Sequence, residues 1–335
     1  MPLEYWLAGA LMASLTLYAL GAGADFGGGV WDLLSSGPRE RAQRDLIAHA
    51  IGPIWEANHV WLILVVVLMF VCFPVAWAGL STALHVPLTL MLLGIVLRGS
   101  AFTFRAYDDA SDAVQRRRGR VFAIASVITP LMLGICAGAV AAGRVRMEGG
   151  QVIGGFVRPW LAAFPIAVGL LAVALFAFLA AVYLTLEAGD DEALREDFRR
   201  RALASGIAVG VVAFLSLVLA RKGAPLVWEG LVGRHWSLPL HAATALAAMG
   251  ALGGLARRRF EFARTCAALQ VTFVLWGWGV SQFPYLVPPS LTFTDAAAPP
   301  AVLGAVLEAL AAGTVILAPS LWLLYRVFKG RRAET

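Results

Sequence analysis

Residues 53–63 read Pro-Ile-Trp-Glu-Ala-Asn-His-Val-Trp-Leu-Ile, and they open a long apolar run while carrying polar side chains into it. The polar side chains are an acid, an amide and an imidazole, at Glu56, Asn58 and His59. An ionisable residue at membrane depth is energetically costly, so it marks a candidate functional site. The stretch therefore predicts a membrane-spanning helix that also carries chemistry.

Composition places the whole chain in the membrane class. Of its 335 residues, 60% are hydrophobic and only 14% are charged, and the mean hydropathy is +0.77. Soluble domains contain roughly a quarter charged residues. The net charge of +6 does not indicate a nucleic-acid partner, because the basic residues lie in short loops between apolar runs, where they encode membrane topology.

The hydropathy pattern predicts an all-α integral membrane protein. A spanning helix needs about 20 mostly apolar residues, and helices or closed barrels alone satisfy their backbones in lipid. The nine runs that meet this length are residues 5–26, 54–74, 79–98, 121–143, 160–186, 203–220, 237–256, 262–283 and 301–328.

The basic residues predict how these spans are oriented. With the N-terminus outside and the C-terminus cytoplasmic, most of the 27 Lys and Arg residues fall on the cytoplasmic side, as the positive-inside rule requires. Residues 1–6 contain Glu4 and no Lys or Arg, so we expect a retained first helix rather than a cleaved signal peptide. No loop is long enough for a soluble domain, and residues 1–335 are predicted to form one polytopic membrane domain.

The cysteines and histidines give no independent sign of a metal or haem site. Cys72, Cys136 and Cys266 are far apart, which favours three buried apolar residues over a disulfide framework. Haem ligands at His85 and His241 are conceivable, but hydrogen-bonded or interfacial histidines fit better. A di-iron site built on the i, i+3 pair of Glu56 and His59 would need a second such pair, which the sequence lacks.

Three ionisable residues should share one membrane depth. In the predicted topology Asp25 ends the first span, Glu56 begins the second and Arg98 ends the third, all on the cytoplasmic side. The carboxylates could pair with Arg98 or line a proton route, or all three could be solvated interfacial residues. Trp61 follows Glu56 by five residues, which is about 7.5 Å deeper along a helix.

A second polar stretch lies at the predicted outer interface. Trp276-Gly277-Trp278 leads into the proline-rich residues 282–289. An aromatic belt followed by a proline-terminated helix end explains this pattern, and a quinone headgroup site is the alternative.

Four of these stretches together resemble subunit II of the cytochrome bd-type quinol oxidases, the CydB family, and the cyanide-insensitive CioB branch fits equally well. They are Asp25-Phe26-Gly27-Gly28-Gly29; residues 53–63; Leu97-Arg98-Gly99-Ser100-Ala101-Phe102 with Arg105; and Phe283-Pro284-Tyr285 with residues 288–292. The likeness extends over almost the whole chain, in order.

The resemblance implies two four-helix bundles plus one peripheral helix, in a bacterial cytoplasmic membrane. It implies a complex that takes electrons from quinol and reduces dioxygen to water with cytoplasmic protons. Haem b, and haem d or b, would be held by the partner, a haem-bearing subunit I. A bound quinone, a small third subunit and surrounding membrane lipids are further candidates for this complex.

By position in the family motifs, the resemblance assigns the cytoplasmic proton entrance to Glu56 and oxygen access to Trp61. Asp25 and Arg98 match family motif residues too, without a defined role there. From the depth that the three residues share, we expect Asp25 in the proton pathway and Arg98 as the charge partner. One departure concerns the proton route: relatives carry an acid two residues before the position of Arg105, where this chain has Thr103.

Two other functions remain open from the residues. A proton-coupled secondary transporter could use Asp25, Glu56 and Arg98 as a coupling site, but such sites lie near the midplane between repeated halves, and residues 160–283 show no repeat of these charges. A scaffold whose polar residues only specify assembly cannot be separated from an oxidase subunit by sequence.

Overall fold

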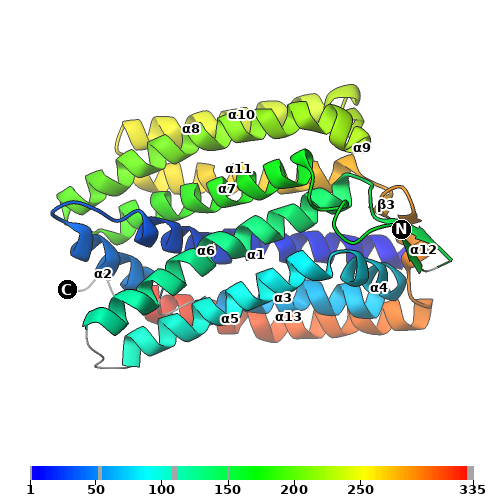
Figure 1. Ribbon diagram of the computed structural model, residues 1–335, viewed down its shortest axis with the longest axis horizontal. Helices are drawn as coiled ribbons and strands as arrows, with labels where there is room; N and C mark the ends of the chain where they lie inside the picture. The colour runs from blue at the N-terminus through cyan, green and yellow to red at the C-terminus, as the bar shows by residue number, and fades with distance from the viewer. Residues whose placement is uncertain (1, 52–54, 108–111, 150, 330–335) are drawn as a thin grey trace.

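The computed structural model describes residues 2–51, 55–107, 112–149 and 151–329, apart from the side chains of 55–56, 104–107, 112–116, 325 and 328–329. Most of the long helices run roughly along one axis, and the start of α1 lies at the opposite end of the molecule from the end of α13 (Figure 1). The helices are α1 Leu3–Leu33, α2 Glu40–Ile51, α3 Trp55–Cys72, α4 Pro74–Ala83, α5 His85–Tyr107, α6 Asp112–Ala141, α7 Ala163–Glu187, α8 Glu192–Gly223, α9 Pro225–Trp228, the π-helix η1 Glu229–Gly233, α10 Ser237–Ala256, α11 Phe260–Ser281, α12 Phe293–Ala296 and α13 Pro300–Lys329.

Two short antiparallel hairpins complete the structure. They pair β1 Arg146–Glu148 with β2 Gln151–Ile153, and β3 Tyr285–Val287 with β4 Leu291–Thr292. The β3–β4 hairpin follows the predicted proline stop after α11. A capping box between Thr292 and Asp295 starts α12, and its hydrogen bonds to Thr292 hold the pKa of Asp295 below its usual value.

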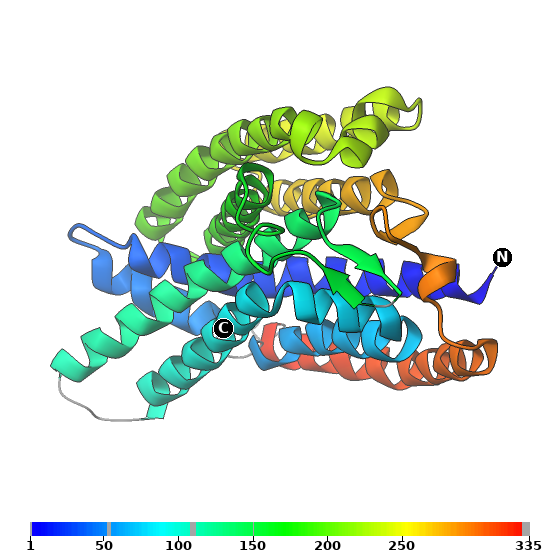
Figure 2. The ribbon, with the colours of Figure 1, turned by 45° about the vertical axis from the view of Figure 1, so that its right-hand side comes forward.

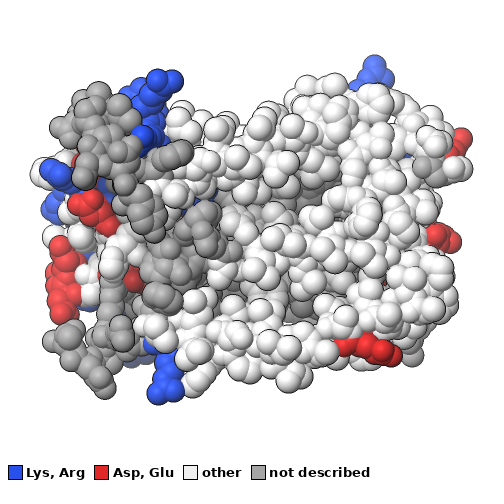
Figure 3. Space-filling view, turned by 90° about the horizontal axis from the view of Figure 1, so that it is seen from below, with Lys and Arg blue, Asp and Glu red and all other residues white. Residues whose placement is uncertain are grey.

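The described residues contain seven helices that are each long and apolar enough to cross a membrane, or eight spans if the bent pair α3–α4 counts as one. A belt with few charged side chains separates the two charged ends (Figure 3). The predicted run 262–283 is present as α11, although it falls outside those eight. The structure thus confirms a helical membrane protein. The predicted number of nine membrane spans is not established by these helices.

Two predicted spans differ from the observed helices at one break in the chain. The apolar runs 54–74 and 79–98 predicted two successive spans, but Pro74 begins a separate short helix, α4, which is bent 117° from α3. Proline lacks the N–H that would continue α3. The next long helix, α5, begins only at His85 and continues to Tyr107.

Helix α1 lies at the centre and contacts α3, α6, α7 and α11, as the turned view shows (Figure 2). The predicted end of this helix at residue 26 is wrong, because the helix continues through Gly27, Gly28 and Gly29 to Leu33. A Cβ on Gly27 would lie 1.9 Å from the backbone oxygen of Phe176. The glycines therefore allow α7 and its neighbours to approach α1, as small residues do between membrane helices.

The three cysteines are buried and free, as predicted. Each lies in an apolar core cluster: Cys266 in the cluster around Phe26 and Phe176, and the other two in a cluster around Phe73.

We predict that Gly27→Ala weakens the α1–α7 contact, because backbone rather than a flexible side chain occupies the space that the new methyl group needs. The expected loss is about 1–3 kcal/mol, measured as a lower thermal midpoint of the purified protein. Gly9→Ala is the matched control, since a Cβ at Gly9 has nothing within 4 Å. An equal midpoint for the two variants would contradict the proposed role of Gly27.

Candidate functional site

Three polar side chains from consecutive long helices meet in the interior. Asp25 of α1 is 2% exposed, Asn58 of α3 is 2% exposed and Arg98 of α5 is 1% exposed. Asn58 Nδ2 donates a hydrogen bond of 2.6 Å to Asp25 Oδ2. A buried carboxylate requires partners of this kind, because removal from water is costly.

Among the described residues, Arg98 is the largest of the fully buried side chains. Its guanidinium carbon lies 4.8 Å from the ring centre of Phe26 and 5.1 Å from that of Phe122. The positive charge also interacts electrostatically with Asp25 and Tyr18. The aromatic faces and the carboxylate together compensate a charge that would otherwise be excluded from a membrane interior.

Two further polar rings border this cluster. The ring centres of Tyr18 and His59 are 6.1 Å apart, and His59 is also 6.1 Å from Phe26. Tyr18 is fully buried, and His59 feels the charge of Arg98. The cluster therefore continues from Arg98 through two side chains able to carry protons.

The cluster lies further from the helix ends than the sequence predicts. Asp25 precedes the end of α1 by eight residues and Arg98 precedes the end of α5 by nine, which at 1.5 Å per residue is about 12 and 13.5 Å. The predicted spans ended at residues 26 and 98, which placed Asp25 and Arg98 at the cytoplasmic edge of the membrane. Their exposures of 2% and 1% are inconsistent with the interpretation of Asp25 and Arg98 as solvated residues.

Glu56 belongs to the first turn of α3, but its side chain lies outside the described residues. A carboxylate in a first turn is favoured by the helix dipole, and Asn58 follows two residues later on the same helix.

Trp61 is partly buried and packs against the apolar cluster that contains Phe26. The structure therefore places Trp61 beside the core that surrounds the Asp25 cluster.

A second polar network, which the sequence did not predict, holds the short helix α2. Asp197 of α8 accepts hydrogen bonds from Arg39 Nε at 2.9 Å and Gln43 Nε2 at 2.8 Å. Arg201 donates to Gln43 Oε1 at 2.7 Å. The bond to Asp197 raises the pKa of Arg39. This network fixes α2, the segment that leads towards α3. The sequence signal that could have predicted a packed helix here is the four-residue spacing of buried Gln43, Ile47 and Ile51.

The remaining histidine candidates have other contacts. His85 Nδ1 lies 2.9 Å from the Thr82 carbonyl, and His241 Nε2 lies 2.7 Å from the Leu231 carbonyl. Within the described ranges, no three His, Cys, Asp or Glu side chains are grouped closely enough to hold a metal ion.

Replacing Arg98 with Met should destabilise the fold by about 3–5 kcal/mol, because Asp25 would keep a buried charge without its compensating cation. The thermal midpoint of the purified protein measures this loss. Arg117→Met is the control, since Arg117 is exposed. Restoration of stability in the double variant Asp25→Asn, Arg98→Met would support the pairing, whereas additive losses would contradict it.

Comparison with known proteins identifies the family. The family model described as cytochrome bd terminal oxidase subunit II matches residues 3–328. The putative cytochrome bd menaquinol oxidase subunit II of Bacillus subtilis is 22% identical over 325 residues, which cover 93% of this chain and 91% of that protein. Cytochrome bd ubiquinol oxidase subunit 2 of the same organism is 34% identical over 93 residues, 28% of this chain and 27% of the relative.

A solved structure shares the fold. A chain of the bd oxidase from Geobacillus thermodenitrificans superposes with a TM-score of 0.77 at 24% identity, covering 98% of this chain and 99% of that chain. None of these relatives supports the transporter alternative. The chain belongs to the cytochrome bd terminal oxidase subunit II family, and is therefore one subunit of a quinol oxidase complex.

Proposed function

We propose that this subunit delivers protons to the dioxygen-reducing centre of its partner, through Glu56 and the buried cluster around Asp25. Reduction of one dioxygen to water consumes protons, and carboxylates at membrane depth are suited to relay them. The observation that carries the proposal is the burial of Asp25, Asn58 and Arg98 at 2%, 2% and 1% exposure. A purely interfacial role would not require this burial.

Each side chain has a distinct task in this proposal. Glu56, in the first turn of α3, accepts protons from the cytoplasmic side, and Asp25 receives them further inside. Asn58 carries no proton but orients the Asp25 carboxylate through their 2.6 Å hydrogen bond. Arg98 supplies the fixed compensating charge. Thr103, where relatives have an acid, is exposed and donates to the Gly99 carbonyl at 3.0 Å, so the route in this chain bypasses that position.

The proposed topology places the N-terminus outside and the C-terminus in the cytoplasm of a bacterium. Counting α3–α4 as one broken span and adding α11 gives nine spans. Helices α1, α3, α5 and α6 would form one bundle, and α7, α8, α10 and α11 the other. The peripheral helix would be α13, of which only 6% of the apolar window is buried inside this chain.

The partner in this proposal is subunit I, which holds the haems and oxidises the quinol. Those haems would supply electron transfer and dioxygen reduction. The relatives' names include both menaquinol and ubiquinol, so the proposal extends to a quinol and not to one quinone type. Trp61, beside the core, is proposed to line the access of dioxygen.

We expect Glu56→Gln to lower quinol-dependent oxygen consumption by about 10²-fold or more, because an amide cannot relay a proton. The haem spectrum of the complex should be unchanged. Glu148→Gln, in the exposed hairpin β1–β2, is the matched control. Wild-type turnover in Glu56→Gln would remove this residue from the proton route.

The same assay, run on Trp61→Ala across a range of dioxygen concentrations, tests whether Trp61 lines the access of dioxygen.

The isolated chain is expected to show no haem absorbance, since the haem ligands are assigned to the partner. Absorbance spectra of the chain expressed alone and of the complex make the comparison. A stoichiometric haem spectrum from the chain alone would contradict the assignment, and variants of His85 and His241 would then identify the ligand.

A further inference from the structure

Among the seven helices that are each long and apolar enough to cross a membrane, α13 is the least covered by this chain. Only 6% of the residues in its most apolar stretch are buried, against 22–56% in the other six. It lies on the opposite side of α1 from α10, along the lower edge of the molecule in Figure 1. Such a helix is surrounded by lipid or by another protein, and its polar residues decide between the two.

One acid, Glu308, lies within the apolar span of α13. It follows Pro300 by eight residues, in a span that continues to Leu324. At 1.5 Å per residue the span is about 37 Å long, and centring it on a hydrocarbon core of about 30 Å places Glu308 about 8 Å inside the core. The Ala298 N–H donates to the Cys72 carbonyl at 2.8 Å. The start of α13 therefore lies beside the end of α3, and Glu308 is about level with the middle of α3.

Glu308 is on the side of α13 that faces away from this chain. Leu303, Leu307 and Leu310 pack into the apolar cluster around Phe73. Glu308 is exposed, and in the part of the chain that the structure describes it makes no hydrogen bond or ion pair. Its carboxylate thus lies at membrane depth on an outer surface of the subunit.

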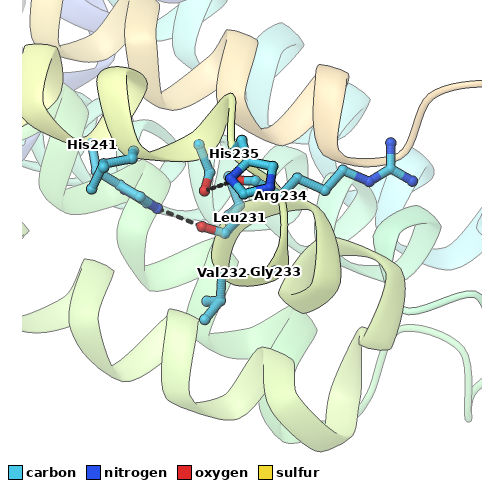
Figure 4. A pocket seen from close by; sticks show the side chains of 8 residues that line it. Leu231, Val232, Gly233, Arg234, His235 and His241 are labelled. Carbon is cyan, nitrogen blue, oxygen red and sulfur yellow. Dashed lines mark hydrogen bonds between the residues drawn. The ribbon is translucent and has the colours of Figure 1, made fainter.

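Other polar side chains within the spans have contacts inside this chain. The Asp25 carboxylate accepts a hydrogen bond from Asn58, and His241 Nε2 of α10 lies 2.7 Å from the Leu231 carbonyl (Figure 4). A glutamate side chain is shorter than the Lys and Arg side chains that reach the membrane surface by snorkelling. Ionisable residues in spans almost always face protein and pair there, so Glu308 indicates a protein against α13.

Small residues surround Glu308 on its face of the helix. Ala301, Ala305 and Ala312 lie seven and three residues before it and four residues after it, and all three are exposed. A Cβ at Gly304 would have nothing within 4 Å. Small residues let two membrane helices approach closely, whereas acyl chains need no such gap. The face therefore suits a second helix.

A second copy of this chain does not fit that face. Two copies inserted in the same direction would meet about a two-fold axis along the membrane normal, with the same residues of α13 in contact. The two Glu308 carboxylates would then lie opposite each other at one depth, where like charges repel strongly. The helix against α13 therefore belongs to a different polypeptide.

We propose that α13 packs against a membrane-spanning helix of the partner subunit, and that Glu308 pairs there with an Arg or Lys side chain. The inference takes the partner, the haem-bearing subunit I, from the proposed function. A carboxylate and a cation in contact compensate each other away from water. The pair also fixes the register of the two helices, and the alanines around Glu308 leave room for the partner's side chain.

The first test measures how fast the two subunits separate. In the purified complex, Glu308→Gln should raise the dissociation rate of the partner at least about tenfold, because the amide leaves a buried cation without its counter-charge. Native mass spectrometry over time gives the rate. Glu261→Gln is the matched control, since Glu261 is exposed and pairs with Arg264 of its own helix at 2.6 Å. An unchanged rate in Glu308→Gln would overturn the charge pair.

The second test locates the partner helix by cross-linking in membranes. Ala312→Cys, labelled with a benzophenone maleimide, should cross-link to the partner subunit. Leu246→Cys on α10, at a position that is 65% exposed, should not. The native cysteines are buried, so the label reports the introduced ones. Cross-links to lipid alone, or to another copy of this chain, would overturn the proposal.

The cross-linked peptide then identifies the basic residue. Reversal of that residue to Glu, combined with Glu308→Lys, should restore slow dissociation, whereas each reversal alone should accelerate it. A partner peptide without Arg or Lys, or additive losses in the double variant, would overturn the pairing. Failure of the proposed function would be seen earlier and separately, as a wild-type chain that purifies without a haem-bearing subunit.

Discussion

Two opposite charges buried in the protein interior constrain the first half of this structure. Arg98 and Asp25 are both almost completely buried, and moving one charge of this kind out of water costs several kcal/mol even after relaxation. That cost is offset only where the carboxylate, the Asn58 amide and the faces of Phe26 and Phe122 are positioned together. The packing of α1, α3, α5 and α6 must therefore hold these groups in one arrangement.

The glycines after Asp25 make that arrangement possible. Gly27 admits the backbone of α7, and Gly29 lies where an added Cβ would be 2.2 Å from the Ser126 side chain of α6. Larger residues would push both helices away from α1. Close backbone packing and the buried charges thus depend on the same turn of the same helix, which links the stability of the membrane domain to the proposed proton route.

Tyr18 connects the charged cluster to an apolar chamber of about 350 Å³ between α1, α6, α7, α8, α10 and α11. Its ring centre lies 6.1 Å from that of His59, and it interacts with the charge of Arg98. Apolar surroundings strengthen the interaction between buried charges. The apolar side of the cluster therefore favours the interaction of Arg98 with Asp25 over solvation of either charge.

The sequence by itself determined the helical membrane class, because apolar runs of this length have no other means of satisfying their backbones in lipid. It also indicated Asp25, Arg98 and Asn58 as unusual, since polar groups in such runs are costly.

The tertiary structure decided where the helices end. Asp25 and three glycines are a typical helix boundary in sequence, yet α1 continues through them because α6 and α7 pack against the exposed backbone. Likewise, the predicted boundary between the spans 54–74 and 79–98 lies near the break between α3 and α4, but the 117° turn there was not predicted. The partners of α2 could not be foreseen either, since Asp197 is more than 150 residues away and only packing in three dimensions brings it to Arg39.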